Sequence, residues 1–339
     1  MRACVVHGAG DLRVDEVATA EPGLGQVAVD VVFGGICGTD LHYYRDGRVG
    51  DFRVVEPMIL GHEVAGRIAV AGDGADAPPP GTPVAIHPAT PCDACRECRA
   101  GHRNVCAATR YLGSAARVPH VQGGFAQRVV VPAEQVRPLP PGLPLRLAAL
   151  TEPLSVALHA VRRAGEVRGG RVLVTGAGPI GCLVVAALRH AGAAEVIVTD
   201  LVDEALALAV RVGATSAVRA GDRAAWPNEV DVAIEASGAP AAFADCVGTI
   251  RRGGTVVMLG MLPPGEVGLV ASTVVTRELH LAGAFRFDTE FDTALDLLAA
   301  GLDVEPVITH TVPLSEAGAA FDLAGDRRSA SKILLELEP

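Results

Sequence analysis

The sequence is poor in basic charge and contains no long hydrophobic run. Its 339 residues hold 29 lysines and arginines against 39 acidic residues, for a net charge of −10, and the basic residues form no cluster. This balance argues against nucleic acid or an anionic membrane as the main partner. The mean hydropathy is +0.34, but charged or turn residues interrupt each apolar stretch before it could span a bilayer.

Lysine is nearly absent, and so are the features of a leader segment. Lys332 is the only lysine. Because it lies in a strand-like run near the C-terminal end, we exclude a Schiff-base mechanism. The first residues, MRACVVHGAGDLRVDEV, lack the cationic and long apolar regions of a signal peptide. We therefore expect a cytoplasmic protein.

The pattern along the chain predicts two domains. Hydrophobic residues make up 50% and charged residues 20% of the chain, which suits a packed globular protein, and its length suits two cores. Up to about residue 140, short β-branched runs that end in glycine or proline predict strands. After residue 144 a helical spacing begins, and strands then alternate with helices. This alternation predicts an α/β fold with a doubly wound parallel sheet.

The predicted elements can be placed by residue number. The strands are expected at 26–35, 61–72, 82–88, 125–140, 171–176, 195–200, 216–220, 230–237, 254–260, 279–285, 307–314 and 331–338. Helices are expected over 144–165, between the strands of the alternating region, near 290–300 and from Ser315.

A glycine-rich motif predicts a dinucleotide site. Gly176, Gly178 and Gly181 form G-x-G-x-x-G around Pro179 and Ile180, directly after a predicted strand and at the start of a helix. The glycines allow a tight turn and close approach of the backbone to a pyrophosphate, which the helix N-terminus favours. Asp200 ends the next strand, where a carboxylate can accept hydrogen bonds from the ribose hydroxyls. Residues 201–203 include no arginine for a 2′-phosphate, so NAD is favoured over NADP.

Four cysteines lie close together in the sequence. Cys92, Cys95, Cys98 and Cys106 are spaced C-x2-C-x2-C-x7-C. Four thiolates suit tetrahedral zinc without an open position, which is a structural site. An iron–sulfur cluster is the rival interpretation, and a disulfide pair is a third that a reducing compartment disfavours.

A second set of possible metal ligands is scattered. Cys37, His62, Glu63 and Glu152 offer one sulfur, one imidazole and two carboxylates. Such a set suits a catalytic zinc that keeps one position for water or substrate. Each residue also has an ordinary interpretation, as a buried thiol, a core histidine or a helix-capping acid. Spacing alone leaves the two interpretations open.

Taken together, these motifs resemble the zinc-dependent medium-chain alcohol and polyol dehydrogenases over essentially the whole chain. The resemblance rests on the order Cys37, His62–Glu63, the four-cysteine segment, Glu152 and the late glycine motif. It implies a GroES-like, β-rich catalytic domain formed by 1–148 with 292–339 and a Rossmann NAD-binding domain formed by 149–291. It also implies an active site in the cleft and a homo-oligomer of two or four chains.

The resemblance implies roles for particular residues. Cys37 and His62 would bind the catalytic zinc, and Glu63 and Glu152 compete for the remaining place. Thr39 would lie next to the alcohol, and His42 would relay its proton outward. Asp40 would orient a ligand histidine. Zinc would act as a Lewis acid while a hydride passes to the nicotinamide.

The substrate is expected to be a small molecule with several hydroxyls. Tyr43 matches a pocket position of the polyol dehydrogenases, and Arg286 an arginine near their substrate, whereas Phe287 stands where sorbitol dehydrogenases tend to have tyrosine. The segments GSAARVPHVQGGFA, GAFRFDTEFDTAL and AGDRRSASKILL are more similar to the bacterial L-idonate 5-dehydrogenases. A sugar acid would suit Arg286, since arginine can bind a carboxylate with two hydrogen bonds.

We therefore expect oxidation of L-idonate at C5 to 5-keto-D-gluconate. A neutral polyol such as sorbitol or xylitol, or threonine, is the alternative substrate. A nucleotide-binding protein without catalysis is the alternative from another class.

Overall fold

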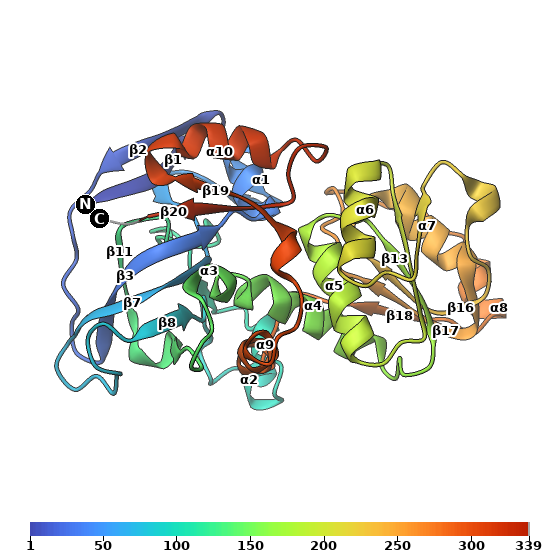
Figure 1. Ribbon diagram of the computed structural model, residues 1–339, viewed down its shortest axis with the longest axis horizontal. Coiled ribbons are helices and arrows are strands. Elements are labelled where there is room, and N and C mark those ends of the chain that lie inside the picture. Colours follow the sequence, from blue (N-terminus) through green and yellow to red (C-terminus); the bar gives the residue numbers. More distant parts are fainter. Residues whose placement is uncertain (338–339) are drawn as a thin grey trace.

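Two β-sheets organise the chain, one in each half of the molecule (Figure 1). The computed structural model describes residues 1–337. A mixed sheet and several shorter strands build the half that contains the N-terminus, and a parallel sheet with helices builds the other half. This arrangement confirms the predicted fold class of a β-rich domain with a Rossmann-type domain.

The mixed sheet joins strands from both ends of the chain. Its order is β12-β8-β7-β3-β20-β19, and β11 also pairs with β3. Strand β20 runs antiparallel to β3, with Leu334 opposite Gly35. The strands are β3 (Gln26–Gly35), β7 (Glu63–Ala71), β8 (Pro83–Ile86), β11 (Arg128–Pro132), β12 (Val136–Pro138), β19 (Ile308–Pro313) and β20 (Lys332–Glu336). The C-terminal segment therefore lies beside the strand that leads into Cys37.

The parallel sheet has helices on both faces. Its order is β15-β14-β13-β16-β17-β18. Side chains of β13 alternate, as expected for a strand covered on both sides: Val172 and Val174 share a core with helices α4 and α5, whereas Leu173 packs with α7. The strands are β13 (Arg171–Thr175), β14 (Glu195–Asp200), β15 (Ser216–Arg219), β16 (Val230–Glu235), β17 (Ile250–Met258) and β18 (His280–Gly283).

The remaining elements are helices and short strands. The α-helices are α1 (Gly38–Asp46), α2 (Arg96–Arg99), α3 (Leu145–Ala148), α4 (Thr151–Ala164), α5 (Pro179–His190), α6 (Asp203–Arg211), α7 (Pro240–Thr249), α8 (Ala271–Thr276), α9 (Glu290–Ala299) and α10 (Ala317–Ala324). The short strands are β1 (Arg2–Gly8), β2 (Asp11–Glu16), β4 (Arg48–Val49), β5 (Phe52–Arg53), β6 (Met58–Ile59), β9 (Ala89–Thr90) and β10 (Arg110–Tyr111). Within the described residues, no helix has the length and apolar character needed to cross a membrane.

One segment has a regular structure that the sequence pattern did not indicate. The residues after Cys37 form helix α1. The side chain of Asp40 accepts a hydrogen bond from the Cys37 N–H, which gives the helix a capping box. Gly47, with φ 63°, ends the helix in the left-handed conformation and donates to the Tyr43 carbonyl. The predicted helix over 144–165 is also divided, into α3 and α4.

Candidate functional site

A thiol, an imidazole and a carboxylate meet at the end of β3. One ligand atom from each of Cys37, His62 and Glu63 lies within 4.8 Å of the other two. Cys37 caps helix α1, whereas Glu63 begins β7 and His62 directly precedes it. Because β3 and β7 pair, with Gly35 opposite Glu63, the sheet brings these distant residues together. A sulfur, a nitrogen and an oxygen donor at this separation fit a zinc ion.

Asp40 fixes the backbone around two of these residues. Its Oδ2 accepts the Cys37 N–H at 3.0 Å and its Oδ1 accepts the Gly61 N–H at 3.2 Å. His62 Nδ1 lies 3.8 Å from Oδ1, which is too long for a hydrogen bond. Burial opposes a charge on His62, but the negative charge of Asp40 and the contact with Cys37 raise its pKa well above 6.5. Asp40 therefore acts on His62 through charge and through the backbone.

Lys332 lies inside this site, which the sequence analysis missed. Its Nζ donates to Glu63 Oε1 at 2.8 Å, to Oε2 at 2.7 Å and to the Ile36 carbonyl at 2.9 Å. Both side chains are buried. Burial raises the pKa of Glu63 to about 7, although the charge of Lys332 opposes that rise. Glu63 also depends on Gly35, because a Cβ there would lie 2.1 Å from its Oε2.

Glu152 approaches the same site from helix α4. Its Oε1 accepts the Tyr111 hydroxyl at 2.6 Å, and the Tyr111 ring lies 5.7 Å from the ring of His62. Its Oε2 has no hydrogen-bond partner among residues 1–337. Glu63 is thus held by a cation within the cluster, whereas Glu152 lies beside it with one oxygen free.

The other candidates on helix α1 occupy different environments. Thr39 is half-buried in the first turn. His42 is exposed, and its Nδ1 lies 2.9 Å from Asp46 Oδ2. Tyr43 is only 2% exposed, packs in the core and accepts the Ala115 N–H with its hydroxyl. Tyr43 stays a predicted substrate contact, with its hydroxyl bound to the Ala115 N–H.

A cavity of about 540 Å³ lies between the two halves of the molecule. The glycine turn forms one wall: Gly178, Pro179 and Ile180 line the cavity, as do Cys37 and His42 from the other half. The turn needs glycine, since Gly176 has φ 94° and a Cβ on Gly181 would lie 1.9 Å from the Gly176 carbonyl oxygen. An elongated ligand in this cavity would reach from the glycine turn to the cluster at Cys37.

Asp200 lies at the end of β14, as predicted, with its carboxylate fully hydrogen-bonded. Oδ1 accepts the N–H groups of Leu201 at 2.7 Å and Val202 at 3.0 Å. Oδ2 accepts the Ala177 N–H and Arg327 Nη2, each at 2.6 Å. Residues 201–203 contain no arginine, whereas this one comes from the loop that follows α10.

The four clustered cysteines also converge. Ligand atoms of Cys92, Cys95, Cys98 and Cys106 all lie within 4.8 Å of one another, and all four are free thiols. The Cys95 N–H donates to the Cys92 sulfur at 3.3 Å, and the Cys98 N–H to the Cys95 sulfur at 3.4 Å. Burial opposes ionisation of Cys106, but a hydrogen bond from the Cys92 N–H helps to lower its pKa to about 6. The geometry suits a closed four-sulfur metal site rather than disulfides.

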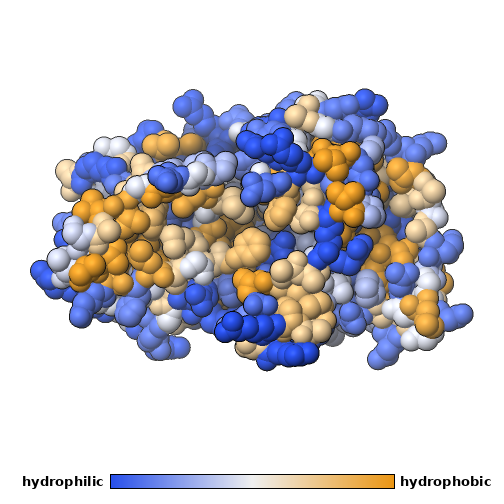
Figure 2. Space-filling model, turned by 180° about the vertical axis from the view of Figure 1, so that it is seen from behind, coloured by the Kyte–Doolittle hydropathy of each residue, from blue (hydrophilic) through white to orange (hydrophobic). Residues whose placement is uncertain are grey.

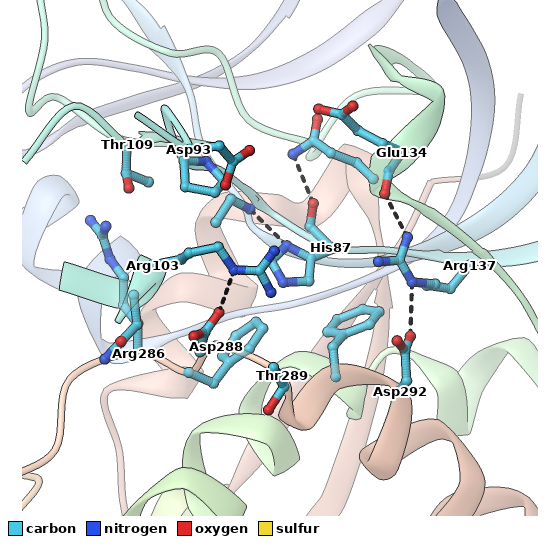
Figure 3. Close-up of a pocket in the computed structure, with 16 residues that line it drawn as sticks. His87, Asp93, Arg103, Thr109, Glu134, Arg137, Arg286, Asp288, Thr289 and Asp292 are labelled. Carbon is cyan, nitrogen blue, oxygen red and sulfur yellow. Dashed lines mark hydrogen bonds and ion pairs between the residues drawn. The ribbon is translucent and has the colours of Figure 1, made fainter. Parts of the chain in front are cut away.

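A second cavity, of about 310 Å³, lies beside the four-cysteine segment (Figure 3). Ion pairs join Arg103 to Asp288 and Arg137 to Asp292, each at 2.8 Å. Arg286 lines the same cavity and has φ 54°. Its guanidinium carbon lies 4.4 Å from the centre of the Tyr111 ring and 4.7 Å from that of Phe285. Within residues 1–337, Arg286 forms no ion pair with an acidic side chain.

A histidine that lines this second cavity, His87, predicts that the protein loses stability at low pH. His87 packs against Phe287 and Phe291, with ring centres 5.0 and 5.1 Å away, and burial lowers its pKa from 6.5 to about 4. The folded protein therefore binds fewer protons here than the unfolded chain. This stabilisation is present above pH 6.5 and is lost as the pH falls through 4. It amounts to about 3 kcal/mol.

The variant His87→Gln isolates this contribution, because glutamine does not titrate. Thermal unfolding between pH 7 and pH 4 should show a smaller decrease in stability for the variant than for the parent. Equal decreases in the two proteins would show that His87 is not the responsible group.

Comparison with known proteins gives matches along the chain. The family model described as "Alcohol dehydrogenase GroES-like domain" matches residues 23–141, and that described as "Zinc-binding dehydrogenase" matches 179–300. The L-idonate 5-dehydrogenase (NAD(P)(+)) of Escherichia coli K12 is 38% identical, with 98% of each chain covered. A sorbitol dehydrogenase of Bacillus subtilis is 33% identical over 96% of this chain and 93% of its own.

Solved structures are similar over the same extent. The E. coli L-idonate 5-dehydrogenase aligns with a TM-score of 0.94 at 36% identity, over 99% of this chain and 98% of that one. A short chain alcohol dehydrogenase of E. coli in complex with NADH aligns with a TM-score of 0.91 at 28% identity, over 99% of each chain. A protein of Sinorhizobium meliloti bound to NADP aligns with a TM-score of 0.90 at 32% identity, over 99% and 98%.

Proposed function

Because the chain belongs to the zinc-binding alcohol and polyol dehydrogenase family, we propose that it oxidises the C5 hydroxyl of L-idonate. The products would be 5-keto-D-gluconate and NADH. The observation that carries this choice is Arg286. Its guanidinium lies over Tyr111, whose hydroxyl binds Glu152, and it has no acidic partner in the described chain. A free arginine beside Tyr111 and Glu152 suits the carboxylate of a sugar acid.

The chain's own residues divide the work of the reaction. Cys37, His62 and Glu63 would hold the catalytic metal, and Glu152, bound to the Tyr111 hydroxyl, would lie beside them. When bound, zinc supplies a Lewis acid and NAD a hydride acceptor. Thr39 orients the substrate hydroxyl, and His42, exposed and hydrogen-bonded to Asp46, passes the proton to solvent.

The remaining ligands have separate sites. Gly176, Gly178 and Gly181, with Pro179 and Ile180, receive the pyrophosphate at the start of helix α5, and Asp200 receives the adenosine ribose. Cys92, Cys95, Cys98 and Cys106 hold a second, structural zinc. In this scheme the catalytic domain is 1–148 with 292–339, and the Rossmann domain is 149–291.

We also propose that the chain forms homo-oligomers through the edge of its parallel sheet. Strand β18 is the last strand of that sheet and leaves backbone groups unpaired. Nearby, Met261, Val270, Val275 and Leu281 are exposed apolar residues. Figure 2 shows apolar side chains gathered at this end of the molecule, on the left.

All eight cysteines are free thiols, which suits the reducing cytoplasm as location.

Reduction of NAD, measured across a panel of substrates, tests the proposed activity. The panel contains L-idonate, sorbitol, xylitol and threonine, with reduction of 5-keto-D-gluconate by NADH as the reverse reaction. A kcat/KM that is highest for L-idonate supports the proposal. A preference for sorbitol or xylitol would favour the neutral-polyol alternative, which the 33% identity to a sorbitol dehydrogenase also supports.

Arg286→Ala should separate the two substrate classes. Losing a charge-assisted hydrogen bond costs about 1.5–3 kcal/mol of binding free energy. The KM for L-idonate should therefore rise roughly 10- to 100-fold. KM for sorbitol should change little, since no carboxylate is present. Arg110→Ala removes the same charge from an exposed residue next to Tyr111 and serves as the control. Equal effects of Arg286→Ala on both substrates would refute the assignment.

A further inference from the structure

The Asp200 carboxylate has four hydrogen-bond donors, of which only one can leave. Three are backbone N–H groups, from Ala177 in the glycine turn and from Leu201 and Val202 directly after β14. These groups are backbone atoms of the two segments that directly follow β13 and β14. The fourth is the Arg327 guanidinium, 2.6 Å away. A carboxylate offers about four lone-pair positions, so a new donor must replace this arginine.

Arg327 is placed to exchange partners. It comes from the loop between α10 and β20, and its side chain is 47% exposed. It lines the cavity between the two halves of the molecule, together with Gly178. A Cβ added at Gly178 would lie 3.7 Å from Arg327 Nη2. The guanidinium therefore lies between the turn that faces a pyrophosphate and the carboxylate that faces a ribose.

Of the arginines that line this cavity, Arg45, Arg211, Arg327 and Arg328, only Arg327 is hydrogen-bonded to Asp200. Arg219 is bound to Asp203 at 2.8 Å and to the Leu201 carbonyl at 2.7 Å. Glu204 lines the same cavity and adds negative charge. Without Arg327, a phosphate on the 2′-oxygen of the ribose would therefore face Asp200 and Glu204 without the cation that is bound to Asp200.

We propose that Arg327 is the residue that admits NADP as well as NAD to this cavity, an inference that rests on the proposed dehydrogenase function. The ribose hydroxyls of NAD can take the place of the guanidinium on Asp200. With NADP, the guanidinium stays between Asp200 and the 2′-phosphate. There it neutralises the Asp200 carboxylate and donates hydrogen bonds to the phosphate. One arginine thus serves both coenzymes by changing its partner.

Equilibrium binding of the reduced coenzymes to the zinc-loaded protein tests this role without a substrate. Fluorescence titration with NADH and NADPH gives a Kd for each. In Arg327→Gln, the Kd of NADPH should rise at least about tenfold, because a charged pair is lost. The Kd of NADH should stay the same or fall, because its ribose no longer competes with a guanidinium.

Two further variants sharpen the test. Arg168→Gln removes the same charge from an exposed loop residue before β13, and it should leave both Kd values unchanged. Asp200→Asn, added to Arg327→Gln, removes the repulsion and should restore part of the NADPH affinity.

Each other outcome contradicts the inference. An equal rise for both coenzymes in Arg327→Gln would make Arg327 a general phosphate contact. No change, or a parent protein that binds NADH but not NADPH, would overturn the role while leaving the proposed function intact. A parent protein that binds neither coenzyme would overturn the proposed function itself, and this inference with it.

Discussion

Cys37→Ala should lower kcat/KM by at least about a thousandfold and reduce the zinc content from two ions per chain to one. The thiol is the only sulfur donor in the cluster with His62 and Glu63, and a metal Lewis acid contributes several kcal/mol to such a reaction. At 1.36 kcal/mol for each factor of ten, the loss of about 4 kcal/mol corresponds to three orders of magnitude. The fold should persist, because Cys37 is a partly exposed helix cap.

Metal analysis and steady-state kinetics on the same preparation check this result. Cys246→Ala is the matched control: it removes a buried thiol from the core of the Rossmann-type half, away from both clusters, and should keep two zinc ions. A Cys37→Ala protein with two zinc ions and full activity would contradict the assignment of Cys37 as a ligand. If the ion that remains is lost on further replacement of Cys98, it belongs to the four-cysteine site.

The features with a local signal could be predicted from the sequence. Strand β3 covers the predicted residues 26–35, and β14 ends at Asp200, because β-branched alternation and bounding glycines are local properties. The glycine motif at 176–181 and the spacing of the four cysteines are local as well. Helix α1 was missed because its Gly38 and two adjacent tyrosines are poor helix formers. Its capping box, from Cys37 and Asp40, is the signal that could have revealed it.

The features that depend on long-range pairing could not be predicted. Lys332 reaches Glu63 because β20 pairs with β3, and β3 with β7. Arg327 reaches Asp200 across the cavity between the two halves. The one available hint for Lys332 was that it is the only lysine of the chain. The contact of the Tyr43 hydroxyl with the Ala115 N–H also joins residues far apart in the sequence.

Lys332→Met should destabilise the protein by about 3 kcal/mol or more. Removing one member of a buried ion pair typically costs 3–5 kcal/mol, because the other charge is left without a partner. Here Glu63 is fully buried and both of its oxygens bind Nζ. The Ile36 carbonyl also loses its bond to Nζ. Thermal unfolding of the zinc-loaded protein should show a Tm lower by roughly 6–12 °C.

A second substitution shows whether the unpaired charge is the cause. In Lys332→Met with Glu63→Gln, no unpaired carboxylate remains at position 63, so more than half of the decrease in Tm should be recovered. Glu63→Gln alone should leave Lys332 unpaired and should lower the Tm. Such coupling of the two substitutions is expected only if the pair acts as a unit. Additive effects would mean that Lys332 stabilises β20 by packing alone.

Because burial already raises the pKa of Glu63 to about 7 against the charge of Lys332, loss of the lysine should raise this pKa further. The carboxylate would then take up a proton near neutral pH and become a poorer metal ligand, so zinc affinity should fall together with stability.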